Sequence, residues 1–533
     1  MHRTAVFVLI FLLLPACAPG TAGVTPTATV AYDPFVPLDG ASPVPVAQGA
    51  SAEPSPIPPT ITPTKRVGPT PTLAALNALL PPTRLPGSPL VSPTPDMPRT
   101  LPTPRLAADQ YVVQAGDTLG SIAQRYGISL EALMQANGLS EADVLSVDQA
   151  LNIPAPQPDE KGPDFKVIPD SELVYGPASV FFDAEAFIEK EGGYLAAYSE
   201  ELDGEILNGA QIVMRVAQNY SVNPRLLLAL LEHQSGWVSN PAPSNLDYPL
   251  GIQDAWHDSL YLQLTWSADT LNWGYYLWRV NAISTWVLAD GSVLPADPTI
   301  NAGTAAVQYF FSKLDDMFTW QGDVTAFGLF QTYFFLFGNP FDYAVEPLIP
   351  ATLQQPRMQL PFEPGITWSF TGGPHGGWDS GSAWAALDFG PPGETAGCSP
   401  SDEWVTAVAD GWVTRTGDGV VMQDLDGDGY EQTGWAVFYM HIESRDRVPE
   451  KTYLYAGERI GHASCEGGFS NGTHVHIARK YNGEWIAADG SLPFVMDGWS
   501  SSGNGVEYDG FLSKGDQVVE AWDGRNDLNQ IGR

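Results

Sequence analysis

The first apolar segment of the chain is a short run at its amino end. Residues 5–14 are all apolar and follow the charged start His2–Arg3. A run of this length is too short to span a bilayer stably, and its place after a basic start is typical of an export signal. We therefore expect residues 1–17 to be a signal peptide that takes the chain out of the cytoplasm.

A second pattern of apolar positions predicts a small folded unit over residues 110–155. A short strand is expected at residues 111–113. Two helices should follow, because apolar residues then recur at the spacing of one helix face. Residues 150–154 supply a closing strand. The unit should therefore be a βααβ module.

Long apolar helices rich in aromatic residues follow in residues 165–352. Asn223 before Pro224 predicts a helix start, because Asn caps helices and Pro fits their first turn. Further helices are expected at residues 302–314 and 324–336. We predict an all-α domain in which most Trp, Tyr and Phe side chains belong to the core.

Two other regions differ in composition. Residues 355–533 alternate strand-like runs with Gly-rich turns, which predicts an antiparallel all-β domain. Residues 18–106 consist largely of Pro, Thr, Ser, Ala and Val, and cannot bury enough apolar surface to offset the entropy of ordering. We expect them to form a disordered stalk between the signal peptide and a multidomain folded part.

The chain has three cysteines, Cys17, Cys398 and Cys465. Residues 14–17, Leu-Pro-Ala-Cys, resemble a bacterial lipobox, in which lipid is attached to the Cys before cleavage. Ordinary secretion with cleavage nearby is the alternative. If Cys17 carries lipid, the other two remain as a disulfide pair, or as two free thiols.

The candidate chemistry lies in a cluster of histidines. Five of the eight His follow residue 370, at positions 375, 441, 462, 474 and 476. His474 and His476 occupy a strand-like run and should emerge on one face of it. A hydrolytic zinc needs three protein ligands, commonly His and a carboxylate, and an open position for water, whose pKa it lowers towards 7.

The residues around these histidines resemble those of the lysostaphin-type zinc endopeptidases, which cut peptide bonds in peptidoglycan. The matching segments are 370–375, 386–389, 439–441 and 472–476. The thirteen-residue step from the first His to the Asp is similar to that of the β-lytic and staphylolysin branch, and Trp384 stands where members with a shorter step have His. The resemblance implies that the zinc ligands are His375, Asp388 and His476, that the catalytic pair is His441 and His474, and that His462 has no role.

The βααβ module resembles a LysM domain, from its opening Tyr-Val-Val-Gln-Ala-Gly-Asp-Thr-Leu to its final Leu-Asn-Ile-Pro. LysM domains bind the N-acetylglucosamine-containing glycan of peptidoglycan or chitin in a groove between two loops. The alternative for each loop residue is a helix cap or turn. The resemblance implies that the glycan-binding loops contain Gly116, Asp117, Thr118, Leu119, Asn137 and Gly138.

An acidic segment interrupts the predicted β domain. Asp424, Asp426 and Asp428 occupy alternate positions before a Gly, as in calcium-binding loops. Trp435 stands at the twelfth loop position, where a calcium loop has Glu. We therefore expect a solvated acidic hairpin turn, with calcium binding as the alternative.

The helix beginning near Pro224 resembles a helix of soluble lytic transglycosylases. Gln234 stands where the catalytic Glu of that family belongs, and Gln cannot donate a proton as a general acid. Glu232 lies about 200° round the helix and cannot replace it. We expect a lysozyme-like domain without glycosidase activity; an unrelated helical domain is the alternative.

These features together predict an exported, lipid-anchored protein that faces the cell wall and hydrolyses peptidoglycan peptides with a zinc-activated water. The LysM module would bind the glycan, and the lipid would hold the chain at the membrane. Nucleic acid is not an expected partner, because a net charge of −36 repels phosphate. The main rival is a noncatalytic wall-binding scaffold or activator of other hydrolases. A freely secreted toxin, without lipid on Cys17, is a third hypothesis.

The lipobox predicts that the mature protein begins at a lipid-modified Cys17. Labelled fatty acid should enter the wild-type chain and should not enter Cys17→Ser. An unmodified amino terminus downstream of residue 17, found by mass spectrometry, would rule out the anchor.

Overall fold

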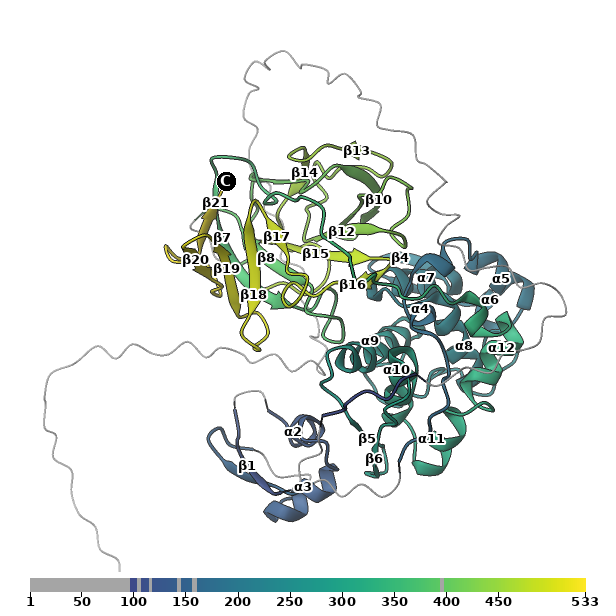
Figure 1. Ribbon diagram of the computed structural model, residues 1–533. Coiled ribbons are helices and arrows are strands. Elements are labelled where there is room, and N and C mark those ends of the chain that lie inside the picture. The colour runs from purple at the N-terminus through teal and green to yellow at the C-terminus, as the bar shows by residue number, and fades with distance from the viewer. Residues whose placement is uncertain (1–95, 103–106, 115–116, 141–144, 156–160, 394–396) are drawn as a thin grey trace, which may run out of the picture.

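The computed structural model describes residues 96–102, 107–114, 117–140, 145–155, 161–393 and 397–533 (Figure 1). The predicted signal peptide, Cys17 and nearly all of the predicted stalk lie outside these residues. In the described part of the chain, none of the helices has the length and hydrophobicity that crossing a membrane requires. A small module, a helical domain and a β-sheet domain follow one another.

The small module is the predicted βααβ unit, with β1 and β2 paired antiparallel. The side chain of Ser129 caps the second helix, and Gly138 ends that helix in the left-handed conformation. Ile122, Leu133 and Ile153 are fully buried between the helices and strands. The elements are β1 (Asp109–Val112), α2 (Leu119–Arg125), α3 (Leu130–Asn137) and β2 (Ala150–Ile153).

The main helix of the helical domain starts at the position that its capping residue predicts. Asn223 caps one helix and Pro224 is its first residue. The helix expected from residue 324 begins instead at Leu329, because the chain turns at Gly328, where a Cβ would lie 2.2 Å from the carbonyl oxygen of Asp323. The helices are α4 (Asp170–Leu173), α5 (Ala184–Glu191), α6 (Tyr194–Ala197), α7 (Gly209–Tyr220), α8 (Pro224–Ser235), α9 (Leu260–Arg279), α10 (Ala302–Ser312), α11 (Met317–Asp323) and α12 (Leu329–Phe337), with 3-10 turns η1 (Pro177–Ser179) and η2 (Pro340–Tyr343).

The prediction that this domain is all-α is wrong in two places. Two hairpins lie among the helices. Asp203 and Gly204 connect the first at φ of 52° and 83°, the positive values that a two-residue hairpin turn requires. An Asp-Gly pair is a recognised sequence signal for such a turn. The hairpins are β3 (Ser199–Leu202) with β4 (Glu205–Asn208), and β5 (Thr285–Val287) with β6 (Val293–Pro295).

The carboxyl-terminal domain is built on a nine-stranded antiparallel sheet in the order β13-β10-β11-β12-β15-β8-β7-β21, with β16 paired to β15. A four-stranded sheet β17-β18-β19-β20 and the pair β14-β9 complete it. The strands are β7 (Thr367–His375), β8 (Ala386–Gly390), β9 (Trp404–Thr406), β10 (Gly411–Gly417), β11 (Val420–Asp424), β12 (Trp435–Met440), β13 (Tyr453–Leu454), β14 (Arg459–His462), β15 (Val475–Tyr481), β16 (Glu484–Trp485), β17 (Val495–Met496), β18 (Trp499–Gly503), β19 (Gly510–Lys514), β20 (Gln517–Glu520) and β21 (Gln530–Gly532).

One face of the large sheet packs against the helical domain. Ala386, Phe438 and Ala478 belong to the same buried cluster as the helices, and so does Trp485 in β16. Figure 1 shows α7 and α9 on the side of the β domain where β12, β15 and β16 lie. The two domains therefore share one hydrophobic core.

The opposite face of the sheet has its own core. Side chains alternate along a strand, so Leu387 and Ile477 point away from the helices and pack in this second cluster. Asp388 and His476 are paired across β8 and β15, in the same register as Ala386 and Ala478. The face that carries them is thus the face that meets the helical domain.

Polar contacts reinforce the junction between the domains. The hydroxyl of Tyr276 accepts a hydrogen bond from the N–H of Trp485 at 3.0 Å. The hydroxyl of Tyr275 donates to Glu484 at 3.1 Å, and Arg279 pairs with the same carboxylate at 2.9 Å. These contacts involve the buried residues Tyr275, Tyr276 and Glu484, and they leave little freedom for the two domains to move independently.

The shared core predicts that the helical and β domains unfold in a single transition. Trp485→Ala should lower the free energy of unfolding by roughly 3–5 kcal/mol, because it opens a cavity between them. Trp522→Ala, at a side chain that is 62% exposed, is the matched control and should change it by less than about 0.5 kcal/mol. Two separate calorimetric transitions, or equal effects of the two substitutions, would contradict the shared core.

Candidate functional site

The three predicted metal ligands come together at neighbouring strands. His375 is the last residue of β7, Asp388 lies in β8 and His476 lies in β15. His375 Nε2 lies 3.0 Å from His476 Nδ1, and Asp388 Oδ1 lies 3.3 Å from each nitrogen. All three residues are buried. They form one group that could hold a metal ion.

The spacing of these atoms fits a tetrahedral zinc. Zinc bonds to His nitrogen and carboxylate oxygen are about 2.0–2.1 Å long, which places tetrahedral ligand atoms roughly 3.3 Å apart. Gly372 makes room for the carboxylate, because a Cβ there would lie 2.6 Å from Asp388 Oδ2. The donor set and its geometry therefore match the predicted zinc site.

Backbone carbonyls fix which ring nitrogen of each ligand faces the centre. His375 Nδ1 lies 2.8 Å from the Gly373 oxygen, and His476 Nε2 lies 3.1 Å from the Gly377 oxygen. A carbonyl oxygen only accepts hydrogen bonds, so these nitrogens carry the hydrogen in a neutral ring. His375 Nε2 and His476 Nδ1 then carry no hydrogen and face Asp388, so their lone pairs are available to bind a metal.

His441 and His474 lie beside this group. Their rings are 4.4 Å apart, and His474 Nε2 lies 3.6 Å from Asp388 Oδ1. His441 Nδ1 lies 3.1 Å from the Glu466 carbonyl oxygen, and His474 Nδ1 lies 2.7 Å from that of Gly472. By the same argument, Nε2 of each ring is bare and able to accept a proton.

The charge of the site is concentrated on Asp388. Burial opposes its ionisation, but the attraction of His375 and His474 outweighs burial and holds the pKa of Asp388 well below its usual range. Burial, followed by repulsion from His474 and His476, lowers the pKa of His441 to about 3. The site therefore pairs an ionised carboxylate with a neutral His441 at neutral pH.

Tyr508 is a neighbour of the site that sequence reasoning missed. Its ring stacks on that of His375, with centroids 4.2 Å apart and an angle of 19° between the planes. Its backbone has a φ of 65°, which is uncommon for an aromatic residue. It lies in the loop between β18 and β19, and its position depends on a fold contact that no local sequence signal reveals.

The loop between His375 and Asp388 is held by the helical domain. Asp269 in α9 accepts hydrogen bonds from Gly381 N–H at 2.7 Å and from the Ser380 hydroxyl at 3.0 Å. The Gly377 carbonyl that orients His476 belongs to the same loop. The thirteen-residue segment from His375 to Asp388 is thus held in place by contacts with α9.

The acidic segment forms the turn between β11 and β12. Asp424 and Asp428 are buried, so the expectation of a solvated turn is wrong for these two residues. Asp424 accepts hydrogen bonds from the N–H groups of Asp426 and Gly429, and Asp428 accepts one from the Thr433 hydroxyl. The three carboxylates are close enough to share an ion. Calcium binding stays the untested alternative.

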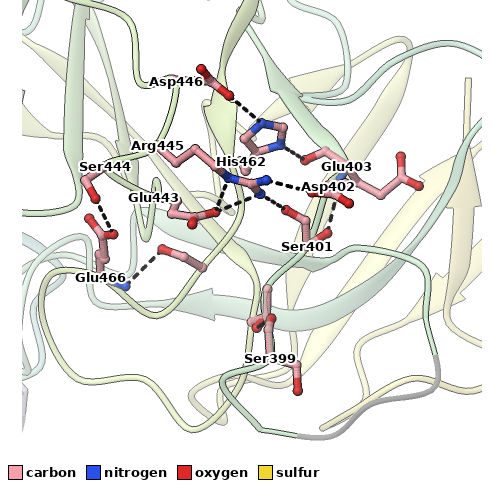
Figure 2. Close-up of polar contacts among 12 residues, drawn as sticks. Ser399, Ser401, Asp402, Glu403, Glu443, Ser444, Arg445, Asp446, His462 and Glu466 are labelled. Carbon is pink, nitrogen blue, oxygen red and sulfur yellow. Dashed lines mark hydrogen bonds and ion pairs between the residues drawn. The ribbon is translucent and has the colours of Figure 1, made fainter. Parts of the chain in front are cut away.

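Cys398 and Cys465 lie in loops, and His462 is the last residue of β14. Cys398 and Cys465 are joined in a disulfide, with their Cα atoms 5.7 Å apart. His462 is buried against Trp404, and its Nδ1 lies 3.3 Å from the Glu403 carbonyl oxygen (Figure 2). Its place away from the metal-ligand group agrees with an ordinary core histidine.

The predicted LysM loop residues have structural partners. Asp117 accepts hydrogen bonds from the Tyr111 hydroxyl and the Gln114 N–H, and Thr118 accepts one from Ser121 N–H. Asn137 bridges α3 and β2 through Asn152. Leu119 and Gly138 mark a helix start and a helix end. Gly116 lies outside the described residues, and glycan binding by these loops stays a prediction.

In the helical domain, Glu232 is engaged by the chain that follows α8. Its carboxylate accepts hydrogen bonds from the N–H groups of Val238 and Ser239, both at 3.0 Å, and from the Ser239 hydroxyl. It therefore acts as a cap for that turn. Gln234 lies near the end of α8, as the sequence predicts, and its side chain is close to Gly251.

Two family models match the chain. Residues 111–154 match the LysM domain, and residues 166–351 match the model described as LasA, N-terminal domain. The helical domain is thus similar to the amino-terminal domain of LasA proteins. The lysozyme-like hypothesis for it stays a prediction.

The chain is also similar to two curated relatives. Protease LasA of Pseudomonas aeruginosa is 26% identical over 343 residues, which cover 60% of this chain and 75% of the relative. The N-acetylmuramoyl-L-alanine amidase XlyA of Bacillus subtilis is 29% identical over 99 residues, 19% of this chain and 32% of the relative.

Among solved structures, the M23 metalloprotease pseudoalterin from the deep sea is 25% identical, with a TM-score of 0.26, over 32% of this chain and 97% of that one. The catalytic domain of lysostaphin from Staphylococcus simulans is 20% identical, with a TM-score of 0.17, over 23% of this chain and 89% of that one. With the matched models, the LasA relative and the His-Asp-His group together, the chain is a LasA-like, lysostaphin-type (M23) zinc metalloendopeptidase that carries a LysM domain.

Proposed function

We propose that this protein hydrolyses the stem or cross-link peptides of bacterial peptidoglycan, with zinc held by His375, Asp388 and His476. One observation carries the proposal. Asp388 Oδ1 is buried, accepts no hydrogen bond among the described residues, and faces the bare nitrogens of His375 and His476. A buried carboxylate needs a compensating positive charge. Two His, one carboxylate and an open fourth position form a catalytic zinc set.

The side chains around this group can carry the proton transfers of peptide hydrolysis. Bound zinc supplies a Lewis acid and lowers the pKa of water. His441 and His474 present bare Nε2 atoms beside the ligands, so one can accept the proton that the attacking water loses and return it to the leaving amine. The other, when protonated, can donate a hydrogen bond to the developing oxyanion. We therefore assign the catalytic pair to these two residues.

The LysM module supports a cell-wall substrate. A glycan-binding module on the same chain raises the effective concentration of wall peptides at the peptidase site. Its proposed contacts are the two loops that contain residues 116–119 and 137–138. The export signal and the lipid on Cys17 would place the protein outside the cytoplasm, held at the membrane and facing the wall.

A noncatalytic scaffold is the rival function. Such a protein can lose metal ligands without loss of its role. Here His375, Asp388 and His476 converge at ligand distances, and His441 and His474 stand beside them. This geometry favours the enzyme.

The proposed site predicts that the purified chain binds about one zinc and releases new amino termini from peptidoglycan. His474→Ala and His441→Ala should lower turnover by roughly 100- to 10,000-fold and keep the metal, because they remove proton transfer. Asp388→Ala should lose the metal as well. Zinc is measured by mass spectrometry, and amine release by labelling of new amino termini.

His462→Ala is the matched control, because it removes a buried histidine of the same domain that lies outside the metal group. It should keep both zinc and turnover. Full activity of His474→Ala, or loss of zinc from it, would contradict the assigned roles. Tight binding of the wild type to peptidoglycan without amine release would favour the scaffold.

For the helical domain we propose a lysozyme-like fold that has lost glycosidase chemistry. Gln234 cannot act as a general acid. The Glu232 carboxylate accepts hydrogen bonds from the backbone of the turn after α8. The full chain carrying His474→Ala should therefore bind purified glycan strands and leave them intact. New reducing or anhydro ends would contradict the loss of this activity.

A further inference from the structure

The two proposed catalytic histidines depend on one loop for their orientation. The carbonyls that accept from Nδ1 of His441 and His474 belong to Glu466 and Gly472, both in the 464–473 loop. The carbonyls that orient the metal ligands come from Gly373 and Gly377, in a different part of the chain. The orientation of the catalytic pair is therefore structurally separate from that of the metal ligands.

The same loop also holds the backbone of His441. This residue has a φ of 63°, in the left-handed region that a non-glycine residue adopts only when its surroundings impose it. Its carbonyl oxygen accepts hydrogen bonds from the N–H of Ser464 at 2.7 Å and from the Ser464 hydroxyl at 3.0 Å. The residue after Ser464 is Cys465. The disulfide bond of Cys465 is therefore one residue away from Ser464, whose hydrogen bonds hold the His441 backbone.

The disulfide ties this loop to residues 397–399. Beside the Cys398–Cys465 bond, Thr473 donates hydrogen bonds from its hydroxyl to the Ser399 carbonyl and from its N–H to the Gly397 carbonyl at 3.1 Å. The two ends of the 464–473 loop are therefore attached to one short segment. His474 follows directly after Thr473.

Further polar contacts connect the 464–473 loop and residues 401–402 to residues 443–447 (Figure 2). Glu466 accepts a hydrogen bond from the Ser444 hydroxyl at 2.9 Å and lies 3.5 Å from Arg447. Arg445 binds Asp402 at 2.8 Å and the Ser401 carbonyl at 2.9 Å. The Asp402 side chain is 90% exposed, and exposed ion pairs contribute little to stability. The disulfide is covalent, so solvent does not weaken it as it weakens these ion pairs.

We propose that the Cys398–Cys465 disulfide is a positioning device for the His441–His474 pair and leaves the metal ligands unaffected. This inference rests on the proposed function for the roles of these two histidines. Opening the bond should free the 464–473 loop, so that the Glu466 and Gly472 carbonyls no longer fix the two rings. Misplacement of catalytic groups by about 1 Å can lower a rate roughly 100-fold.

The test compares the full chain with its Cys398→Ser/Cys465→Ser variant. We expect kcat for amine release from purified peptidoglycan to fall roughly 100-fold, with KM and zinc content unchanged. Nitrogen NMR of the imidazoles should show that His441 and His474 lose their fixed Nδ1–H form, whereas His375 keeps its Nδ1–H form and His476 keeps its Nε2–H form. Arg445→Gln, which removes exposed contacts of the same segments, is the control and should behave as the wild type.

A second measurement keeps the test decisive if the double variant does not fold. Reduction of the Cys398–Cys465 bond in the folded wild-type chain with a phosphine reductant should also lower kcat roughly 100-fold while zinc stays bound, and an unchanged kcat would overturn the inference. An unchanged kcat and unchanged imidazole spectra in the folded double variant, or loss of zinc together with activity, would overturn the inference. If the wild type releases no amines, the proposed function fails, and the imidazole spectra alone decide whether the disulfide orients the pair.

Discussion

A buried negative charge that needs a cation is the constraint on which the site depends. Asp388 sits on a central strand, and its buried Oδ1 accepts no hydrogen bond among the described residues and faces the inner ring nitrogens of His375 and His476. The surrounding architecture preserves this arrangement. The β8–β15 register places His476 opposite it, and Gly372 leaves space for its carboxylate. The carbonyls at the outer side of each imidazole keep the inner nitrogens free of hydrogen.

The helical domain also supports the site that contains Asp388. Its core continues onto the sheet face that carries Asp388 and His476, through Phe438, Ala478 and Trp485. Asp269 in α9 also holds the loop whose Gly377 carbonyl orients His476. The metal-ligand group is therefore enclosed by contacts from two domains, while the proposed catalytic pair is held by a loop within the β domain. The proposed metal ligands and the proposed proton-transfer residues thus have different structural supports.

Much of this site follows from the sequence because its signals are local. Alternation places His474 and His476 on one face of a strand, and the order of His and Asp residues matches a known family. The capping residues Asn223 and Ser129 likewise mark helix starts. Prediction failed for the stacking of Tyr508 on His375, because this contact joins residues far apart in the chain. It also failed for the burial of Asp424 and Asp428, because alternating carboxylates before a Gly do not reveal whether N–H and hydroxyl groups of the turn bond to them.

The central claim is that a metal ion occupies the space between His375, Asp388 and His476. Anomalous diffraction from crystals of the full chain, recorded on both sides of the zinc absorption edge, tests it most directly. The account predicts one strong peak about 2.0–2.1 Å from His375 Nε2, His476 Nδ1 and an oxygen of Asp388. The absence of a peak there in zinc-supplemented crystals, or a zinc peak confined to the Asp424, Asp426 and Asp428 turn, would contradict it.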